Sequence, residues 1–225
     1  MELELKRGGR TARVETLGGE LVSYRDERGL EYIWGGDPAY WPGRNPLLFP
    51  IVGTLKEGKI RFDGREYAME RHGFARRREF TPVARGEDWV RLELRESAET
   101  LALYPYPFRL AVEQRLTDTG FSTAVTVANP GEGPLPFCLG AHTGFRCPLE
   151  AGERFEDYEL VFPERESCPT LLLRDGLLDR PAALPCLEDT DTLPLDYRWF
   201  DALDTLIFEG LRSRSVTLRS RKSGR

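Results

Sequence analysis

Histidine, methionine and cysteine are scarce in this chain of 225 residues, which contains two, two and four of them. The cysteines, Cys138, Cys147, Cys168 and Cys186, have neither the paired spacing of a zinc site nor a C-x-x-C redox motif. We therefore interpret them as small, mostly buried apolar residues. Two histidines without a nearby cluster of carboxylates also make a poor metal site, so no metal ion is expected.

Long apolar runs and a concentrated basic face are missing as well. No apolar run approaches the roughly 20 residues that a membrane-spanning helix needs. The segment Met1–Arg7 alternates charged residues with leucine instead of forming an apolar leader. The formal net charge is -5 and the arginines are spread along the chain, which is not the pattern of a nucleic-acid-binding domain. We expect a cytoplasmic protein that binds neither membranes nor nucleic acids.

Short segments that alternate apolar and polar residues dominate what is present, as half-buried strands do. They occur at 3–5, 60–62, 90–94 and 216–218. The turn sequence Asp63-Gly64 lies between 59–62 and 66–69 and predicts a β-hairpin. The sequence Thr-Asp-Thr-Gly separates 109–116 from 121–128 in the same way, and Asn129-Pro130 ends the second of these strands.

Helical patterns are few in this sequence. Residues 97–103 form a candidate short helix capped by Ser97, and residues 196–201 a candidate single turn. No internal repeat, low-complexity segment or convincing linker is present. Many short strands with regular turn signals predict an all-β protein, built as a single β-sandwich or barrel domain over residues 1–225.

The two histidines lie in similar local sequences. His72 occurs in R-H-G-F-A-R and His142 in G-A-H-T-G-F, each beside small residues and shortly before a phenylalanine. Glycine lets a ligand or another backbone approach closely, and imidazole suits proton transfer near neutrality because its ordinary pKa is about 6.5. The residues alone leave two interpretations open: hydrogen-bonded structural histidines, or a pair of proton-transfer groups.

Longer motifs carry a resemblance to a known family. Residues 41–56 read W-P-G-R-N-P-L-L-F-P-I-V-G-T-L-K, and R-H-G-F-A-R follows a short hairpin at 71–76. Residues 136–149 read P-F-C-L-G-A-H-T-G-F-R-C-P-L, and residues 204–218 read D-T-L-I-F-E-G-L-R-S-R-S-V-T-L. In this order, over nearly the whole chain, these motifs resemble bacterial aldose 1-epimerase-like proteins. The pair F-P-I-V-G and H-G-F-A-R is the most specific part of the match.

The resemblance implies a large twisted antiparallel β-sandwich of the galactose mutarotase-like type, with a pocket for a sugar. It implies interconversion of the α and β anomers of an aldohexose without a cofactor, by a monomer or a homodimer. His142 is similar to the family's general acid for the sugar ring oxygen, and His72 to its second active-site histidine. Arg44 and Asp204 are similar to the arginine and aspartate that bind the sugar hydroxyls.

Aromatic side chains commonly cover the apolar face of a bound sugar. Trp34, Trp41, Phe74 and Phe145 lie close in sequence to the motifs above, and they are candidates for this role. Core packing is the favoured interpretation for each of them, because large aromatic residues are usually buried.

One element of the family pattern has no counterpart in the sequence. The family's base is a glutamate on a strand near the C-terminus, in an E-P-W-like setting, and Glu209 does not lie in that context. We therefore expect a C-terminally incomplete domain, with a sheet edge and an apolar face uncovered. The chain is then either a shortened form of an epimerase-like protein or a natural short form.

Four functions remain open from the sequence. An aldose 1-epimerase is the leading hypothesis, and a catalytically silent carbohydrate-binding protein is the first alternative because the glutamate is missing. An epimerase of a phosphorylated hexose is the second alternative, although no clear phosphate-binding cluster is visible in the sequence. A purely structural β-sandwich is the last.

Overall fold

The structure, a computed structural model, describes residues 1–203 and 205–224, and their side chains except those of residues 180–186 and 202. The chain consists of two compact units, Met1–Arg146 and Cys147–Arg225. The single domain expected over residues 1–225 stays a prediction. Within the described residues, none of the helices is long and apolar enough to span a membrane.

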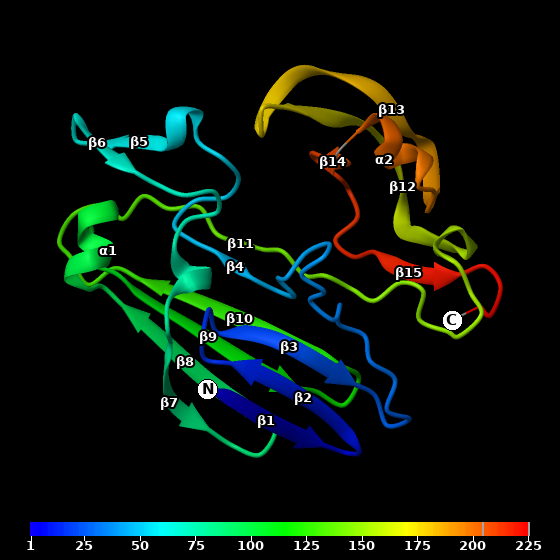
Figure 1. The fold of residues 1–225 in the computed structure, drawn as a ribbon, viewed down its shortest axis with the longest axis horizontal. Coiled ribbons are helices and arrows are strands. Elements are labelled where there is room, and N and C mark those ends of the chain that lie inside the picture. The colour runs from blue at the N-terminus through cyan, green and yellow to red at the C-terminus, as the bar shows by residue number, and fades with distance from the viewer. Residues whose placement is uncertain (204, 225) are drawn as a thin grey trace. The chain divides into compact units, whose positions relative to one another are not determined.

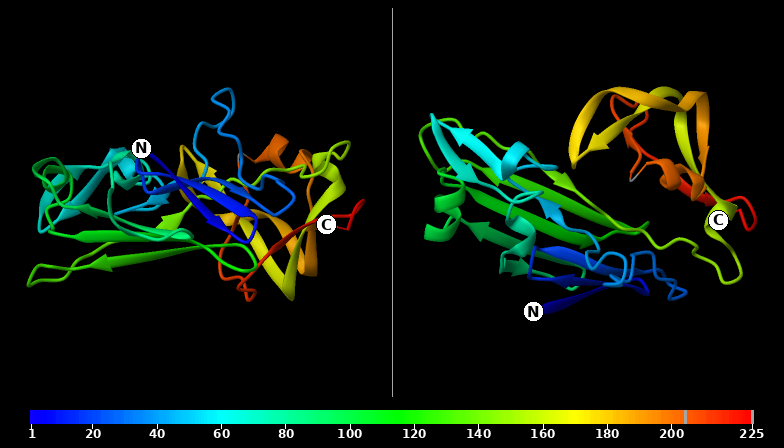
Figure 2. Two further views of the ribbon diagram at one scale, coloured as in Figure 1. Left: turned by 90° about the horizontal axis from the view of Figure 1, so that it is seen from below. Right: turned by 45° about the horizontal axis from the view of Figure 1, so that its top comes forward.

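Two antiparallel sheets make up most of the first unit (Figure 1). One contains β1 (Glu2–Arg7), β2 (Arg10–Glu15) and β3 (Glu20–Arg25), in that order. The other has the order β10-β9-β8-β7 and contains β7 (Thr81–Arg85), β8 (Trp89–Arg95), β9 (Arg109–Leu116) and β10 (Phe121–Ala128). Figure 2 shows them as two layers, coloured blue and green.

The core of the first unit lies between these sheets. Leu3 and Leu5 of β1 are buried, whereas the charged residues between and beside them face solvent. Val90 and Leu92 of β8 are fully buried in the same apolar cluster. Burial of each such side chain contributes about 1.5–3 kcal/mol, so the alternation seen in the sequence selects which face of each strand turns inward. The predicted all-β antiparallel fold is confirmed.

Both predicted hairpins are present. The first consists of β5 (Lys59–Phe62) and β6 (Arg65–Ala68), joined at Asp63-Gly64, and the second consists of β9 and β10. The predicted helix is α1 (Ala98–Leu103). Ser97 caps it, since the Ser97 Oγ accepts from the Thr100 amide at 3.3 Å and the Thr100 Oγ1 accepts from the Ser97 amide at 2.8 Å.

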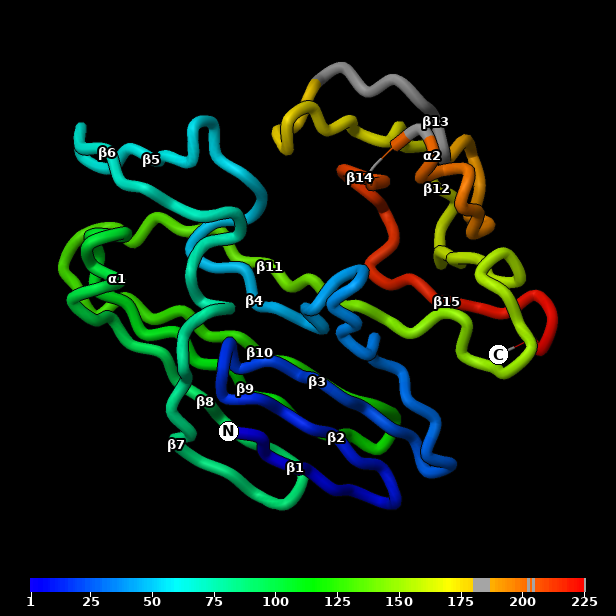
Figure 3. Tube along the Cα trace, in the orientation of Figure 1, coloured from blue at the N-terminus to red at the C-terminus, as the bar shows by residue number. Residues whose placement is uncertain are grey.

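Two very short strands lie at the centre of the first unit. β4 (Leu47–Leu48) pairs with β11 (Gly140–Ala141), as the light blue and yellow-green tubes show in Figure 3. Two 3₁₀ helices, η1 (Lys56–Gly58) and η2 (Ala75–Arg77), follow β4 along the chain. This pairing joins parts of the chain that are far apart in sequence.

The second unit is built on a long two-stranded ribbon. Its elements are η3 (Phe155–Asp157), β12 (Tyr158–Arg174), β13 (Leu177–Pro194), α2 (Arg198–Ala202), β14 (Ile207–Phe208) and β15 (Thr217–Ser220). β12 pairs with β13, β14 and β15. Glu166 is 2% exposed and accepts hydrogen bonds from the amides of Arg212 and Ser213, at 3.0 and 2.7 Å. This carboxylate therefore holds the loop before β15.

The cysteines follow the prediction in part. Cys168 is buried and Cys147 is half-buried, and burial raises the pKa of the Cys147 thiol to about 11. Cys138 is exposed, so the expected burial is wrong for this residue, which lies in an irregular segment outside the core. The side chain of Cys186 lies outside the described residues.

Strand β10 has a partner on one side only among the strands that the structure describes, namely β9. Its sequence, F-S-T-A-V-T-V-A, contains no charged residue, glycine or proline. The side chains exposed on it are Ser122, Thr123, Ala124 and Thr126. β10 is therefore an edge strand of its sheet among the described strands, and the uncovered edge expected of an incomplete domain stays a prediction.

Candidate active site

The fold brings His72 and His142 together in the first unit, with their ring centroids 6.1 Å apart. Strand β4 and the residues after it connect the two segments. β11, which ends directly before His142, pairs with β4 on one side. The Phe49 carbonyl, just after β4, accepts hydrogen bonds from the amides of Phe74 and Ala75, at 3.0 and 3.2 Å.

The backbone around His72 has an unusual conformation. His72 and Gly73 both have positive φ angles, 67° and 69°. A reciprocal pair of hydrogen bonds holds the histidine there: its amide donates to the Gly53 carbonyl at 2.9 Å, and the Gly53 amide donates to its Nδ1 at 3.0 Å. A left-handed conformation in a residue other than glycine is rare, and surrounding contacts of this kind maintain it.

The Gly53 amide also determines the tautomer of His72. Because Nδ1 accepts a hydrogen bond, the neutral ring carries its proton on Nε2. Nε2 lies 3.2 Å from Nε of Arg71, and in this tautomer both atoms are donors, so that contact is not a hydrogen bond. One oxygen atom within reach of both nitrogens could accept a hydrogen bond from each of them. In the neutral ring, Nε2 of His72 is therefore a hydrogen-bond donor without an acceptor among the described residues.

The surroundings of both imidazoles favour the neutral form. Burial, with the charges of Arg71 and Arg76 and the nearby His142, lowers the pKa of His72 to about 4. Burial and the same two arginines also lower the pKa of His142. Near neutral pH both rings are uncharged, and a protonated His142 would be a stronger acid than free histidine.

We expect the two histidines to titrate separately and below the ordinary range. The ¹H signal of the His72 ring should titrate with a midpoint near pH 4, well below its unfolded value of about 6.5. Because this folded-state pKa is depressed, its contribution to stability is complete above the unfolded pKa and is lost as the pH falls toward 4. NMR titration and melting temperatures between pH 7 and 4 check this; a His72 midpoint near 6.5 would contradict it.

Trp41 packs directly against His142, with ring centroids 4.7 Å apart. Two glycines leave room for its indole. A Cβ atom on Gly43 would lie 2.7 Å from its Cζ2, and one on Gly144 would lie 2.8 Å from its Cζ3. Glycines beside the tryptophan and the histidine in the sequence motifs thus have a packing function, and Trp41 is the aromatic candidate that lies at the site.

The other three aromatic candidates have different environments. Phe74 is 5% exposed and belongs to the core, as the favoured interpretation predicts. Trp34 is half-buried, and its Nε1 donates to the Trp41 carbonyl at 2.8 Å. Phe145 is 62% exposed, so core packing is wrong for this residue. Its backbone forms an isolated antiparallel bridge with Ile33, and its side chain is left on the surface.

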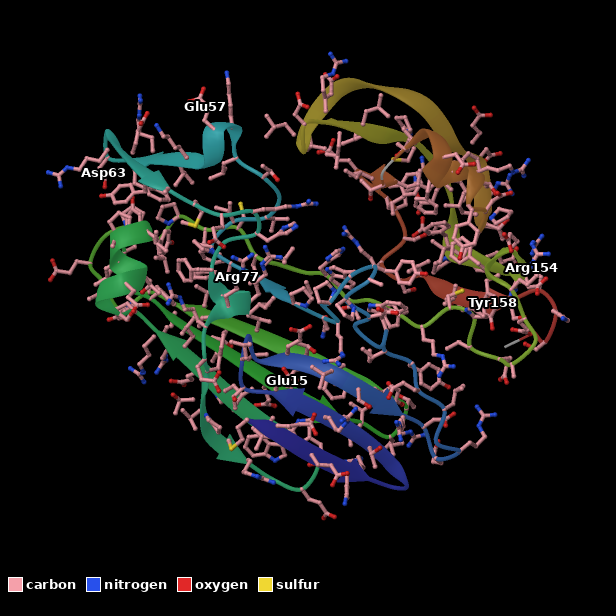
Figure 4. All side chains as sticks on the ribbon, in the orientation of Figure 1. Glu15, Glu57, Asp63, Arg77, Arg154 and Tyr158 are labelled. Atoms are coloured by element: carbon pink, nitrogen blue, oxygen red, sulfur yellow. The ribbon has the colours of Figure 1, made fainter. Side chains whose placement is uncertain are left out.

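Arg44 lies beside His142 through its backbone. Its carbonyl accepts from the Gly144 amide at 2.7 Å. Its guanidinium is held elsewhere, since Nε donates to the Gly35 carbonyl at 3.2 Å and Nη1 lies 3.7 Å from Glu15, which Figure 4 labels on β2. The role of Arg44 in substrate binding stays a prediction. Asp204 lies outside the described residues.

Two arginines near the histidines were not among the predicted site residues. Arg76, on η2 next to the Arg77 labelled in Figure 4, donates from Nη2 to the Arg71 carbonyl at 2.8 Å. Its Nε is buried and has no hydrogen-bond partner within the described part of the chain. Both arginines were visible in the R-H-G-F-A-R motif.

In the described residues, no three His, Cys, Asp or Glu side chains gather as metal ligands would.

The family assignment agrees with this site and fold. The chain belongs to the aldose 1-epimerase family, whose model matches residues 1–191. The resemblance seen in the motifs is therefore confirmed. Membership supports a general epimerase-like function on a sugar and an isomerase-type enzyme.

Particular relatives show how far the likeness extends. The plasmid form of Protein LacX from Lactococcus lactis subsp. lactis is 42% identical, over all of this chain and 78% of LacX. The structure of a galactose mutarotase related enzyme from Lactobacillus acidophilus matches with a TM-score of 0.90 and 28% identity, over 99% of this chain and 74% of that one. A galactose mutarotase-like protein from Lactobacillus casei matches with a TM-score of 0.87 and 29% identity, over 99% and 76%. The galactose mutarotase-like fold is thus confirmed.

Proposed function

We propose that the protein interconverts the α and β anomers of an aldohexose by opening and closing the sugar ring. The observation that carries the proposal is the pair of imidazoles, His72 and His142, with ring centroids 6.1 Å apart in a member of the aldose 1-epimerase family. Ring opening breaks the bond between C1 and the ring oxygen. The ring oxygen gains a proton, and the anomeric hydroxyl loses one.

Each imidazole has a separate proposed role. His142 remains accessible to solvent although its ring is partly covered by Trp41. In the described structure neither of its ring nitrogens has a hydrogen-bond partner, so it can exchange protons. In its protonated form His142 gives a proton to the ring oxygen, and its lowered pKa makes that form a stronger acid. The proton of the anomeric hydroxyl passes to water, and ring closure reverses both transfers. His72, with its proton on Nε2, donates a hydrogen bond to a sugar oxygen together with Arg71. After the carbonyl rotates, the ring closes on its other face.

A phosphorylated hexose is the second candidate substrate. Arg71 and Arg76 lie close enough to both histidines to lower their pKa, and the buried Nε of Arg76 is an unused donor. Guanidinium groups bind phosphate oxygens strongly because their donors match the oxygen geometry. The sequence shows no clear phosphate-binding cluster, but Arg71 and Arg76 together supply donors of the kind that such a cluster needs.

Anomer exchange measured on this chain tests the proposal. Freshly dissolved α-D-glucose, α-D-galactose and their 6-phosphates would be followed by polarimetry and NMR in a buffer of low catalytic power. The chain should accelerate exchange of at least one sugar, and a double variant, His72→Asn with His142→Gln, should not. Saturable sugar binding without acceleration would replace the enzyme by a carbohydrate-binding protein. A folded chain with neither sugar binding nor acceleration would contradict both functions.

The cytoplasmic location stays a prediction.

A further inference from the structure

The position of His142 is determined by a neighbouring segment of the chain. Residues 44–46 run antiparallel to residues 142–144: the His142 amide donates to the Pro46 carbonyl at 3.1 Å, and the Gly144 amide donates to the Arg44 carbonyl at 2.7 Å. Between these two bonds, the Thr143 hydroxyl donates to Oδ1 of Asn45 at 2.6 Å. A displacement of 44–46 would therefore move His142.

One carboxylate fixes that segment to the core sheet. Oε1 of Glu20 accepts hydrogen bonds from the amides of Arg44 and Asn45, at 2.8 and 2.6 Å. Hydrogen bonds to an ionised acceptor are stronger than those between neutral groups. Glu20 begins β3, and the next two residues, Leu21 and Val22, are 4% and 6% exposed. Its own backbone is thus held by the packed core.

The same carboxylate also has an electrostatic effect on the second segment of the site. Attraction by Glu20 acts on Arg76, where it opposes the effects of burial and of Arg77 on the arginine's pKa. The charge of Glu20 therefore acts on Arg76 of η2, in addition to holding the segment 44–46 that pairs with residues 142–144. Glu20 can influence the position of His142 through these segments without contacting either imidazole.

We propose that Glu20 is a positioning residue for His142, which it holds in place through the backbone of residues 44–46. The proposal rests on the proposed function of the two histidines. In its absence the segment 44–46 would lose two charge-assisted hydrogen bonds and would shift away from β3. A misplacement of about 1 Å in a catalytic group can lower a rate on the order of 100-fold. Glu20 itself touches neither the sugar nor the transferred protons.

Three variants separate positioning from general stabilisation. Glu20→Ala removes both hydrogen bonds. Glu20→Gln keeps an oxygen acceptor and removes the charge. Asp26→Ala is the matched control, because Asp26 directly follows the other end of β3 and also accepts from two amides, those of Arg28 and Leu30, at 3.0 and 2.9 Å. Asp26 is 8% exposed, so its replacement should lower the melting temperature at least as much.

The NMR signals of the two histidine rings give a direct readout, because the chain contains two histidines and single-histidine variants assign them. Glu20→Ala should shift the His142 ring signal and its titration midpoint and slow anomer exchange about 10- to 100-fold. Glu20→Gln, which keeps the acceptor oxygen without its charge, should give values between those of the wild type and Glu20→Ala, and Asp26→Ala should change neither. An unchanged His142 signal in Glu20→Ala would overturn the proposal. So would an Asp26→Ala variant that shifts the His142 signal as much as Glu20→Ala does, since a general loss of stability would then be sufficient.

This experiment distinguishes the positioning role from the proposed function. If the wild-type chain does not accelerate anomer exchange, the proposed function fails, but the ring signals still test the positioning. If the wild-type chain is active and Glu20→Ala retains its rate and its His142 signal, the positioning proposal fails while the function stands.

Discussion

The His142→Gln variant is expected to lose about 10²–10⁴-fold in the rate of anomer exchange, the usual contribution of a general acid or base. Glutamine fills similar space and forms hydrogen bonds, but it cannot take up and release a proton near neutral pH. The backbone hydrogen bond from residue 142 to Pro46 is retained, so the fold should not change. Polarimetry gives the rate, and circular dichroism verifies the fold.

The matched control is His72→Asn. Asparagine tolerates a positive φ angle better than most residues, so the backbone conformation of 67° at this position is kept. If His72 acts as a donor, this variant should lose less activity than His142→Gln and should mainly raise KM. Equal losses in kcat for the two variants would contradict the assignment of proton transfer to His142.

Gly73→Ala is expected to lose on the order of 4 kcal/mol or more in the free energy of unfolding, or to fail to fold. A Cβ atom at this position would lie 2.2 Å from the Phe49 carbonyl oxygen and 2.7 Å from the Pro50 nitrogen. Both are backbone atoms next to β4, and Phe49 is fully buried. Urea denaturation of the wild type and the variant measures the difference.

Gly64→Ala separates the steric contact from the cost of the backbone conformation. Gly64 also has a positive φ angle, 79°, but nothing lies within 4 Å of a Cβ atom there. Its replacement should cost only the left-handed conformation, about 1–2 kcal/mol. Similar losses in the two variants would show that the segment at Phe49 can move aside.

Local signals in the sequence predicted local structure well. Asp63-Gly64 and the sequence between β9 and β10 were sufficient for two hairpins, because turn chemistry acts between neighbouring residues. The pairing of β4 with β11 had no such signal. Each of these strands has two residues, which is too short to show a period, and their contact is long-range. Only the family resemblance, and no local signal in the sequence, could therefore predict that His72 and His142 lie close together.

The directions of side chains were the second feature that could not be predicted from the sequence. Arg44 was selected for its guanidinium, yet its carbonyl lies beside the His142 segment and its guanidinium contacts the Gly35 carbonyl. Arg71 and Arg76 belong to a motif in the sequence, but the sequence did not indicate that their charges act on both histidines. Their placement depends on the turn between them, in which His72 and Gly73 have positive φ angles. Nothing in a linear pattern reveals such a turn.

The one-sided pairing of β10 has a consequence for handling the protein. Every second one of its eight residues directs its main-chain amide and carbonyl toward the side where no described strand pairs, and none of the eight carries a charge that would repel another copy. Such an edge is a template on which further strands add, so self-association should increase steeply with concentration and with storage time. Rates and binding constants are best measured on dilute samples whose size has been verified by light scattering.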